Sequence, residues 1–443
     1  MVLPVWSVRT SRIALLGGTT LALLLCMYLW NPVSNMQTWV KMPGFLESTT
    51  ANPGQSPMLG LFPEESVYDP SLWMDRNMKT MHRLLSCTAA GTCLQNQTKI
   101  VLLGDFHMVG TIRGELQGEH VWGRSILAAL DELGYSYLFS ETNQEVVQQY
   151  RMFPDKVVAI ILDPQAILEC FSNQYCLKSN SNRHGIPFWL LFGFHWWRGA
   201  ASHPLGERWV ISPEHYQNEQ VYIGYSIQDA CSKRTYIPFH DRPNQAYILA
   251  KFAQYFLPED FLWTNEAFEL ASKTVDVNFV VGLRDSPAPS ADALPPATRN
   301  LGPLDQDHFF DAVAHSKVLV GVGHPFLSPS PWDALCVGVP FIQPTLWSDP
   351  GDPHDTSKWI SQHDPMMNLG EPYAYTVLQG DTEGFVQAMK KALTTPIQPY
   401  VHPEMTKEGV TRRMGAFLSF DWRGLGMEIL KNRTNTGGEM YAL

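Results

Sequence analysis

The sequence has few basic residues for its length. Its 443 residues include 32 Lys and Arg against 43 Asp and Glu, which gives a formal net charge of −11. Such an acidic chain is not expected to bind nucleic acid or an anionic membrane surface. The sequence also lacks internal repeats and low-complexity tracts, and its length is sufficient for two ordinary domains.

Cysteine is scarce, and no cysteines have the spacing of a zinc site. The seven cysteines are Cys26, Cys87, Cys93, Cys170, Cys176, Cys231 and Cys336. Cys26 lies in an apolar segment, and the even number that remains fits disulfides in an oxidising compartment. Cys87–Cys93 and Cys170–Cys176 are close enough in sequence to close short loops, whereas Cys336 is either paired or a buried free thiol.

The N-terminal region contains one long uncharged run. Residues 13–30 are mostly apolar and just long enough to cross a bilayer as a helix. Arg9 and Arg12 precede this run and Lys41 is the first charge after it, which predicts a cytosolic tail at 1–12 and a lumenal remainder. A cleaved signal peptide is the alternative, but the segment around Tyr28 lacks small residues for cleavage.

Residues 31–98 read as a lumenal stem, because Pro, Gly, Ser and Asn recur and long periodic patterns are absent. Its apolar residues suggest that part of the stem packs on the catalytic body. Asn96 and Asn432 begin Asn-x-Thr glycosylation sequons, which are meaningful only in a lumenal chain.

From Lys99 the sequence alternates between apolar strands and helical segments, which predicts an α/β fold with largely parallel sheets. In the first half we expect strands at 100–103, 136–139, 157–162 and 188–194, a helix at 124–133, and an interdomain crossing at 202–218. In the second half we expect a first strand at 221–225, a helix-like segment at 246–256, a strand at 275–281, a helix at 307–315, a strand at 373–377 and a helix at 384–393.

The segment 316–344 reads as strand, glycine loop, short helix and strand. Gly321 and Gly323 allow a sharp turn and a close ligand approach. Ser330 is a suitable N-cap, with Asp333 three residues later as in a capping box. The free N–H groups of such a helix start suit a diphosphate, and an acidic residue one turn in suits a ribose hydroxyl. An ordinary βαβ unit with a proline-rich turn is the alternative.

This segment resembles the donor-binding segment of the α-1,6-mannosylglycoprotein 6-β-N-acetylglucosaminyltransferases (N-acetylglucosaminyltransferase V). The shared pattern is Gly321, Gly323, Pro325, Pro329, Pro331, Asp333, Ala334 and Gly338, with Asp333 in place of the family's Glu. Residues 396–417 are also similar to the family. The part of the chain that lies between these two segments resembles the family only weakly. The family's cysteine-rich C-terminal extension is largely missing, because no cysteine follows Cys336.

The resemblance implies a GT-B-like fold of two Rossmann-like domains with a cleft between them. It implies an N-terminal acceptor domain at 99–215, a nucleotide-sugar domain at 216–395 and a helical segment at 396–443, behind a signal anchor at 13–30. The implied protein is a Golgi type II single-pass membrane glycoprotein with a lumenal catalytic domain. The implied donor-site residues are Gly321, Gly323, His324, Pro325, Pro331, Trp332 and Asp333.

The implied reaction is the inverting transfer of GlcNAc from UDP-GlcNAc to the 6-hydroxyl of a mannose on an N-glycan, with no metal and no other cofactor. Inversion needs one base for the acceptor hydroxyl. Gly114-Glu115-Leu116 resembles the family's Gly-Glu-Leu, whose Glu is that base. A solvated loop carboxylate is the alternative for Glu115, and Asp105 and Glu119 are rival bases.

The leaving diphosphate needs positive charge. Asp305-Gln-Asp307 could hold a metal, but its place before an expected helix favours capping. The family's loop lysine aligns with Pro353, so Lys358 or Lys251 is the candidate to replace it.

Trp196 and Trp197 could line an acceptor groove, with a packed aromatic corner as the alternative. His324 and His363 are polar groups near the inferred donor site. Two other functions remain open: a GT-B transferase with another donor or acceptor, and a non-catalytic lumenal glycan-binding protein.

Overall fold

The computed structural model describes residues 68–115, 117–197, 203–216, 218–285 and 294–442, and all of them fall in one compact unit. The expected tail, the membrane segment at 13–30 and most of the stem lie outside the described residues. Within the described ranges, no helix is both long and apolar enough to span a bilayer.

The N-terminal lobe contains a parallel sheet in the order β2-β1-β3-β4-β5-β6. Its strands are β1 (Ile100–Gly104), β2 (Ser136–Phe139), β3 (Val157–Leu162), β4 (Leu191–Phe194), β5 (Val210–Ser212) and β6 (Val221–Tyr222). Its helices are α3 (Phe106–Ile112), α4 (Gly118–Glu132), α5 (Asn143–Met152) and α6 (Pro164–Ser172), followed by α7 (Gln228–Cys231) in the connection to the second sheet. The central strands are buried on both faces, which is why they read as continuous apolar runs.

The C-terminal lobe contains a second sheet in the order β12-β11-β10-β7-β8-β9, with β13 also paired to β11. Its strands are β7 (Gln245–Leu249), β8 (Asn278–Val281), β9 (Thr298–Asn300), β10 (Val318–Gly321), β11 (Phe341–Trp347), β12 (Ile360–Ser361) and β13 (Ala374–Val377). Its helices are α8 (Asn265–Val275), α9 (Gln306–Ala314), α10 (Ser330–Cys336), α11 (Asp364–Leu369) and α12 (Thr382–Thr394). Every pairing is parallel except that of β11 with β12.

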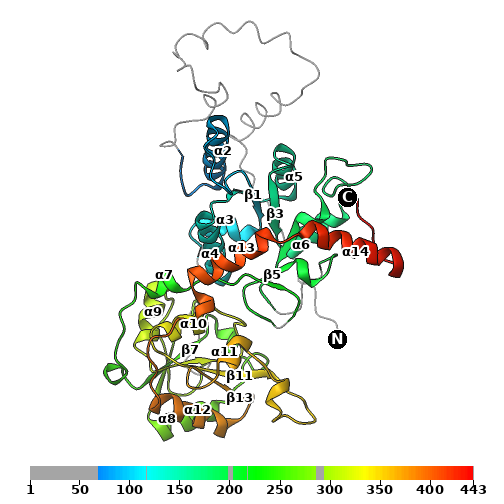
Figure 1. Cartoon of the computed structure of the whole chain (residues 1–443). Helices are drawn as coiled ribbons and strands as arrows, with labels where there is room; N and C mark the ends of the chain where they lie inside the picture. Colours follow the sequence, from blue (N-terminus) through cyan, green and yellow to red (C-terminus); the bar gives the residue numbers. More distant parts are fainter. Residues whose placement is uncertain (1–67, 116, 198–202, 217, 286–293, 443) are drawn as a thin grey trace, which may run out of the picture. The chain divides into compact units, whose positions relative to one another are not determined.

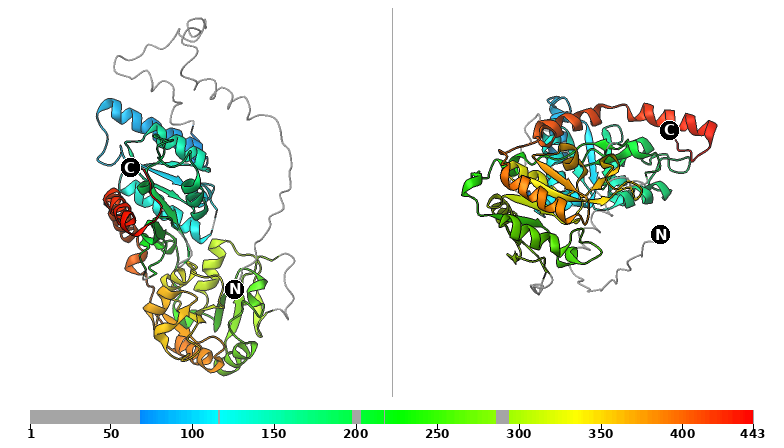
Figure 2. Two further views of the ribbon diagram at one scale, coloured as in Figure 1. Left: turned by 90° about the vertical axis from the view of Figure 1, so that its right-hand side faces the viewer. Right: turned by 90° about the horizontal axis from the view of Figure 1, so that it is seen from below.

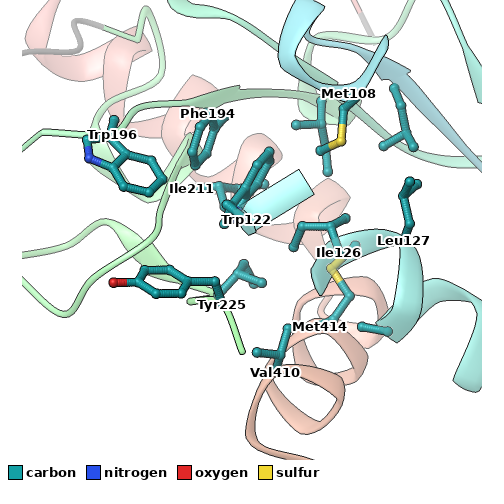
Figure 3. Packing of buried hydrophobic residues seen from close by; sticks show 14 of the residues in the cluster. Met108, Trp122, Ile126, Leu127, Phe194, Trp196, Ile211, Tyr225, Val410 and Met414 are labelled. Atoms are coloured by element: carbon teal, nitrogen blue, oxygen red, sulfur yellow. The ribbon is translucent and has the colours of Figure 1, made fainter. Parts of the chain in front are cut away.

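The last two helices return to the N-terminal lobe. Helix α13 (Lys407–Ser419) packs against α4, and α14 (Trp422–Thr436) packs against the 3₁₀ turn Phe188–Leu190 (Figures 1 and 2). Figure 3 shows Val410 and Met414 of α13 beside Ile126 of α4. The C-terminal segment is therefore part of the core of the N-terminal lobe.

One stem segment is more regular than the sequence suggests. Helix α2 (Trp73–Ala90) has 18 residues, although no periodic helix was expected there. Its buried Asn77 binds the backbone of strand β2, donating to Phe139 O and accepting from Phe139 N, each at 2.8 Å. The expectation that part of the stem packs on the body is confirmed for this helix.

Three expectations about chain segments are wrong. The segment 246–256 is strand β7 followed by a 3₁₀ turn, because its apolar residues lie in the middle of a parallel sheet. The expected crossing at 202–218 contains strand β5, and the expected first strand of the second domain is β6 of the first sheet. The first sheet therefore extends to Tyr222, and the proposed domain boundaries remain a prediction.

All six cysteines of the described residues are in disulfides. Cys87–Cys93 and Cys170–Cys176 close short loops, as expected. Cys336 is not a free thiol, because it pairs with Cys231 across 105 residues. This bond ties the C-terminal end of α10 to α7.

Candidate functional site

A cleft is lined by residues of both lobes, at the ends of several parallel strands. Its cavity volume is about 120 Å³, with further space that is open to solvent. Strands β7, β8 and β10 end at one edge of their sheet, and the loops after them carry Lys251, Arg284 and Ser328 into the cleft wall. The carboxyl edge of a parallel sheet is the usual ligand site of such folds.

The opposite wall comes from the start of α4. Gly118 lies in close contact with Trp196 and with Pro329, the residue before α10, so a Cβ at Gly118 would stand 2.9 Å and 3.1 Å from their side chains. About one and two turns further along α4, Val121 and Arg124 also line the cleft. The glycine therefore allows an N-terminal-lobe helix to approach the donor-segment helix closely.

Three cationic side chains line this cleft: Arg124, Lys251 and Arg284. Burial lowers the pKa of Lys251, and neighbouring Arg284 lowers it further, while Glu119 acts in the opposite direction. Arg284 also donates its backbone N–H to Lys251 O at 2.8 Å. The cleft thus offers positive charge to an anion.

Asp333 lies one turn into α10 and faces the same cleft. Burial raises its pKa to about 7, and Arg234 and Arg124 only partly offset that rise. A carboxyl group in such a position can accept hydrogen bonds from hydroxyls of a bound ligand. The structure therefore brings Asp333 and Lys251, expected from the sequence, into one cleft.

The helix start differs from the expected capping box. The N-cap of α10 is Pro329, not Ser330, and no side chain caps the helix. Ser328 Oγ instead donates to Ser330 Oγ and accepts from Ser330 N, while Asp333 N donates to Pro329 O. Asp333 is therefore free of a capping role and turns to the cleft.

Gly321 and Gly323 do not face the cleft, which corrects the expectation that a ligand approaches them. A Cβ on Gly321 would stand 2.1 Å from Gln362 Oε1, and Gly323 N donates to that same oxygen at 3.0 Å. Gly323 also has a φ of +110°, which favours glycine. Gly321 thus makes room for the side chain of Gln362, whereas a Cβ on Gly323 would stand 2.8 Å from the side chain of Leu262.

The other residues of the donor segment have structural contacts. His324 stacks on Tyr255, with ring centroids 5.6 Å apart, and it is not in the cleft wall. Pro325 O accepts from Gln362 Nε2 at 3.0 Å. Pro331 is buried in the first turn of α10, and Trp332 is 3% exposed. The sequence pattern thus marks the whole segment, but only part of it faces the cleft.

Of the two candidate lysines, only Lys251 lines the cleft. Lys358 lies in a 3₁₀ turn and pairs with two carboxylates, Asp349 at 2.5 Å and Asp355 at 3.5 Å. The Lys358 ammonium group is thus paired with two carboxylates, and Lys358 does not line the cleft in this structure. Asp305 caps α9 by accepting from His308 N, as expected, which accounts for the Asp-x-Asp pattern.

Glu115 lies on the loop between α3 and α4, close to where the cleft begins at Gln117. Its side chain is 49% exposed, and its Oε2 is 3.4 Å from His120 Nε2. Its backbone oxygen accepts from Arg124 at 3.5 Å. Glu115 is therefore tied to a cleft residue and keeps a carboxylate that a substrate can reach.

The rival carboxylates have other surroundings. Asp105 is 1% exposed and caps α3, where its Oδ1 also contacts His107 Nδ1 at 2.9 Å. Glu119 lies in the first turn of α4 and acts electrostatically on Lys251 across the cleft. The geometry leaves Glu115 as the most accessible of the three.

The two candidate tryptophans, Trp196 and Trp197, have different surroundings. Trp196 is buried, donates its Nε1 to Leu327 O at 3.1 Å and lies against Tyr225 (Figure 3). It is part of the core, so the expectation that it lines an acceptor groove is wrong. Trp197 is 49% exposed and stays a candidate surface for a sugar ring.

The two sequons differ in exposure. Asn432 is exposed on α14, whereas Asn96 is partly buried and donates its Nδ2 to Leu133 O at 2.9 Å. Whether either carries a glycan remains a prediction.

Sequence reasoning missed Arg124, Arg284 and Glu214. The first two are single basic residues in segments without a motif, and only the tertiary fold brings them to the cleft. Glu214, which follows β5, is 1% exposed and accepts hydrogen bonds from Tyr225 and Trp332. Among the described residues, no group of three acidic, His or Cys side chains could hold a metal.

Comparisons with known proteins agree with the donor-segment pattern. Residues 211–421 match the model of glycosyltransferase family 18. Human α-1,6-mannosylglycoprotein 6-β-N-acetylglucosaminyltransferase B is 31% identical over 137 residues, 28% of this chain and 17% of the relative. The mouse B enzyme is 22% identical over 354 residues, 71% of this chain and 43% of the relative. The Cricetulus griseus A enzyme is 23% identical over 231 residues, 48% of this chain and 30% of the relative.

The matched part thus spans less than half the length of each of these relatives. Among solved structures, sucrose-phosphate synthase from Thermosynechococcus elongatus aligns with a TM-score of 0.38 at 12% identity, covering 77% of this chain and 100% of that chain. An O-GlcNAc transferase mutant from Thermobaculum terrenum aligns with a TM-score of 0.39 at 10% identity, covering 84% and 74%. Over residues 211–421, this chain is therefore similar to glycosyltransferase family 18, whose model agrees with the aligned relatives and the donor-segment pattern.

Proposed function

We propose that this chain transfers GlcNAc from UDP-GlcNAc to the 6-hydroxyl of a mannose on an N-glycan, with inversion and without a metal. The observation that carries the proposal is the cleft, which combines three cations, the Asp333 carboxyl and the nearby Glu115. Two α/β lobes that share a nucleotide cleft are the plan of GT-B transferases. The names of the relatives supply the sugar and the acceptor.

Each residue has one role in the proposed reaction. Lys251, Arg284 and Arg124 attract the diphosphate and stabilise the negative charge that develops as UDP leaves. Asp333 accepts hydrogen bonds from the ribose hydroxyls. Glu115 takes the proton from the acceptor hydroxyl as that oxygen attacks the anomeric carbon from the face opposite the diphosphate. The C–O bond to the diphosphate breaks as the new bond forms, and UDP leaves with the bonding pair.

The proposal extends to location. The uncharged run at 13–30 would anchor the protein in the Golgi membrane with its catalytic part in the lumen. Three disulfides among the described residues fit an oxidising compartment.

The test is transfer by the lumenal part of the chain, with UDP-GlcNAc and a biantennary N-glycan in the presence of EDTA. We expect a glycan product that gains one GlcNAc, and UDP release that EDTA does not reduce. Release that depends on added metal would contradict the cation-based donor site. No transfer from UDP-GlcNAc, but transfer from another sugar of a donor panel, would favour a transferase with a different donor.

Replacing Lys251 with Met is expected to weaken UDP binding by about tenfold or more, because a charge-assisted hydrogen bond contributes about 1.5–3 kcal/mol. Lys358→Met is the matched control, since it removes an equal charge whose carboxylate partners lie outside the cleft wall. Calorimetric titration with UDP measures both. A larger loss of UDP affinity in Lys358→Met than in Lys251→Met would indicate that Lys358 contacts the diphosphate.

A further inference from the structure

A buried carboxyl group joins the two lobes directly behind the donor segment. Glu214, which follows β5 of the N-terminal lobe, accepts from Tyr225 OH at 2.7 Å. The same oxygen, Oε1, accepts from Trp332 Nε1 of α10 at 3.1 Å. A residue of the first sheet thus holds the tryptophan that precedes Asp333 in the chain.

The Trp332 side chain is 3% exposed, and its ring centroid lies 5.9 Å from that of His363 and 5.4 Å from that of His402. A cavity of about 490 Å³ is lined by Trp332, Glu214, Tyr222 and His402, among others. The hydrogen bond from the indole N–H to Glu214 adds a directional contact to this packing.

Helix α10 is short, with seven residues, and it has no side-chain cap. Its C-terminal end is tied to α7 by the Cys231–Cys336 disulfide. Its first turn is tied to the N-terminal lobe by the Glu214–Trp332 hydrogen bond. The second tie acts on the turn that carries Asp333, so a change there rotates or shifts the carboxyl group in the cleft.

We propose that Glu214 is a positioning residue, which holds Trp332 and thereby orients Asp333 toward a bound nucleotide. This inference rests on the proposed function, because it assumes that the cleft takes a uridine nucleotide. Glu214 is 1% exposed and is absent from the cleft wall, so it acts through α10 and does not touch the nucleotide.

The test is UDP binding, measured by calorimetry alongside melting temperature, so that it does not depend on turnover. Trp332→Phe keeps an aromatic ring, although a smaller one, and removes the indole donor, and we expect it to raise the Kd for UDP about five- to tenfold. Glu214→Ala should do the same. Glu214→Gln keeps an oxygen that can accept both hydrogen bonds, so it should restore the Kd to within about threefold of wild type.

Trp209→Phe is the matched control. Trp209 is also fully buried and donates its indole N–H, here to Trp189 O at 3.4 Å, but it lies in the N-terminal lobe away from α10. It should lower the melting temperature as Trp332→Phe does and leave UDP binding unchanged.

Wild-type affinity in Trp332→Phe would overturn the positioning role, as would an equal loss in Trp209→Phe. If Glu214→Ala does not fold, Trp332→Phe decides alone. A wild-type protein that binds UDP but transfers no GlcNAc would contradict the proposed reaction and leave this comparison valid. A wild-type protein that binds no UDP would overturn both.

Discussion

Glu115→Gln is expected to lower the rate of GlcNAc transfer by about 10²- to 10⁴-fold, because general base catalysis contributes effects of that size. The amide has nearly the same shape as the carboxylate but cannot take the proton from the acceptor hydroxyl. Glu115 is half exposed and is not in the wall of the cleft that would hold UDP, so the Kd for UDP-GlcNAc should change little. Chromatography of the glycan product gives the rate, and calorimetry gives the Kd.

The control for this variant is Glu141→Gln. Glu141 is also an exposed carboxylate on a loop that follows a strand of the first sheet, and it pairs with Arg113 at 2.6 Å. The Glu141→Gln variant should transfer GlcNAc at the wild-type rate. Full activity of Glu115→Gln would remove Glu115 as the base, and loss of activity in Asp105→Asn or Glu119→Gln instead would identify which rival takes its place.

The sequence predicted the location of the cleft because local patterns determine it. Apolar runs mark the strands, and in a parallel sheet the loops that follow strands gather at one edge. Strands β2 and β3 have the predicted bounds, and the donor segment folds as strand, loop, helix and strand. Asp333 faces the cleft for this reason, whereas Lys251 was expected on a helix and instead follows strand β7.

The errors come from contacts that are distant in sequence. Nothing near Gly321 indicates that Gln362 fills the space that the glycine leaves. Trp196 is buried because residues of the C-terminal lobe cover it, including Leu327, whose carbonyl its indole binds. Arg124 belongs to the site only because α4 meets α10. Such pairings between lobes have no periodicity that sequence reasoning could detect.

Asp333 gives the second large prediction, since burial raises its pKa from the ordinary 3.8 to about 7. Between pH 3.8 and about pH 7 the folded protein keeps a proton on Asp333 that the unfolded chain has released. The free energy of unfolding must therefore fall as the pH rises through this range. The loss is about 4 kcal/mol and is complete above about pH 7. Asn cannot ionise, so Asp333→Asn should be more stable than wild type near pH 8 by up to about 4 kcal/mol. Denaturant unfolding at several pH values measures this difference.

The same substitution should weaken binding of UDP-GlcNAc by tenfold or more, because the ionised carboxylate accepts hydroxyl hydrogen bonds about twice as strongly as a neutral group. In wild type the affinity should rise about tenfold from pH 6 to pH 8, as the fraction of ionised Asp333 rises, and binding near pH 7 should release protons. UDP-GlcNAc is the suitable ligand, because UDP itself has a phosphate that titrates near pH 6.

Asp311→Asn is the control, since Asp311 is an exposed aspartate on α9, the helix beside α10. It should change neither stability nor affinity. An Asp333→Asn variant that binds UDP-GlcNAc as wild type does would contradict the ribose contact. One that is less stable than wild type at high pH would contradict the buried, proton-holding carboxyl. If Asp333→Asn is more stable than wild type at high pH but binds UDP-GlcNAc more weakly, then the ionised Asp333 carboxylate destabilises the fold and strengthens ligand binding. Ligand binding is then the physical reason for an aspartate at this position.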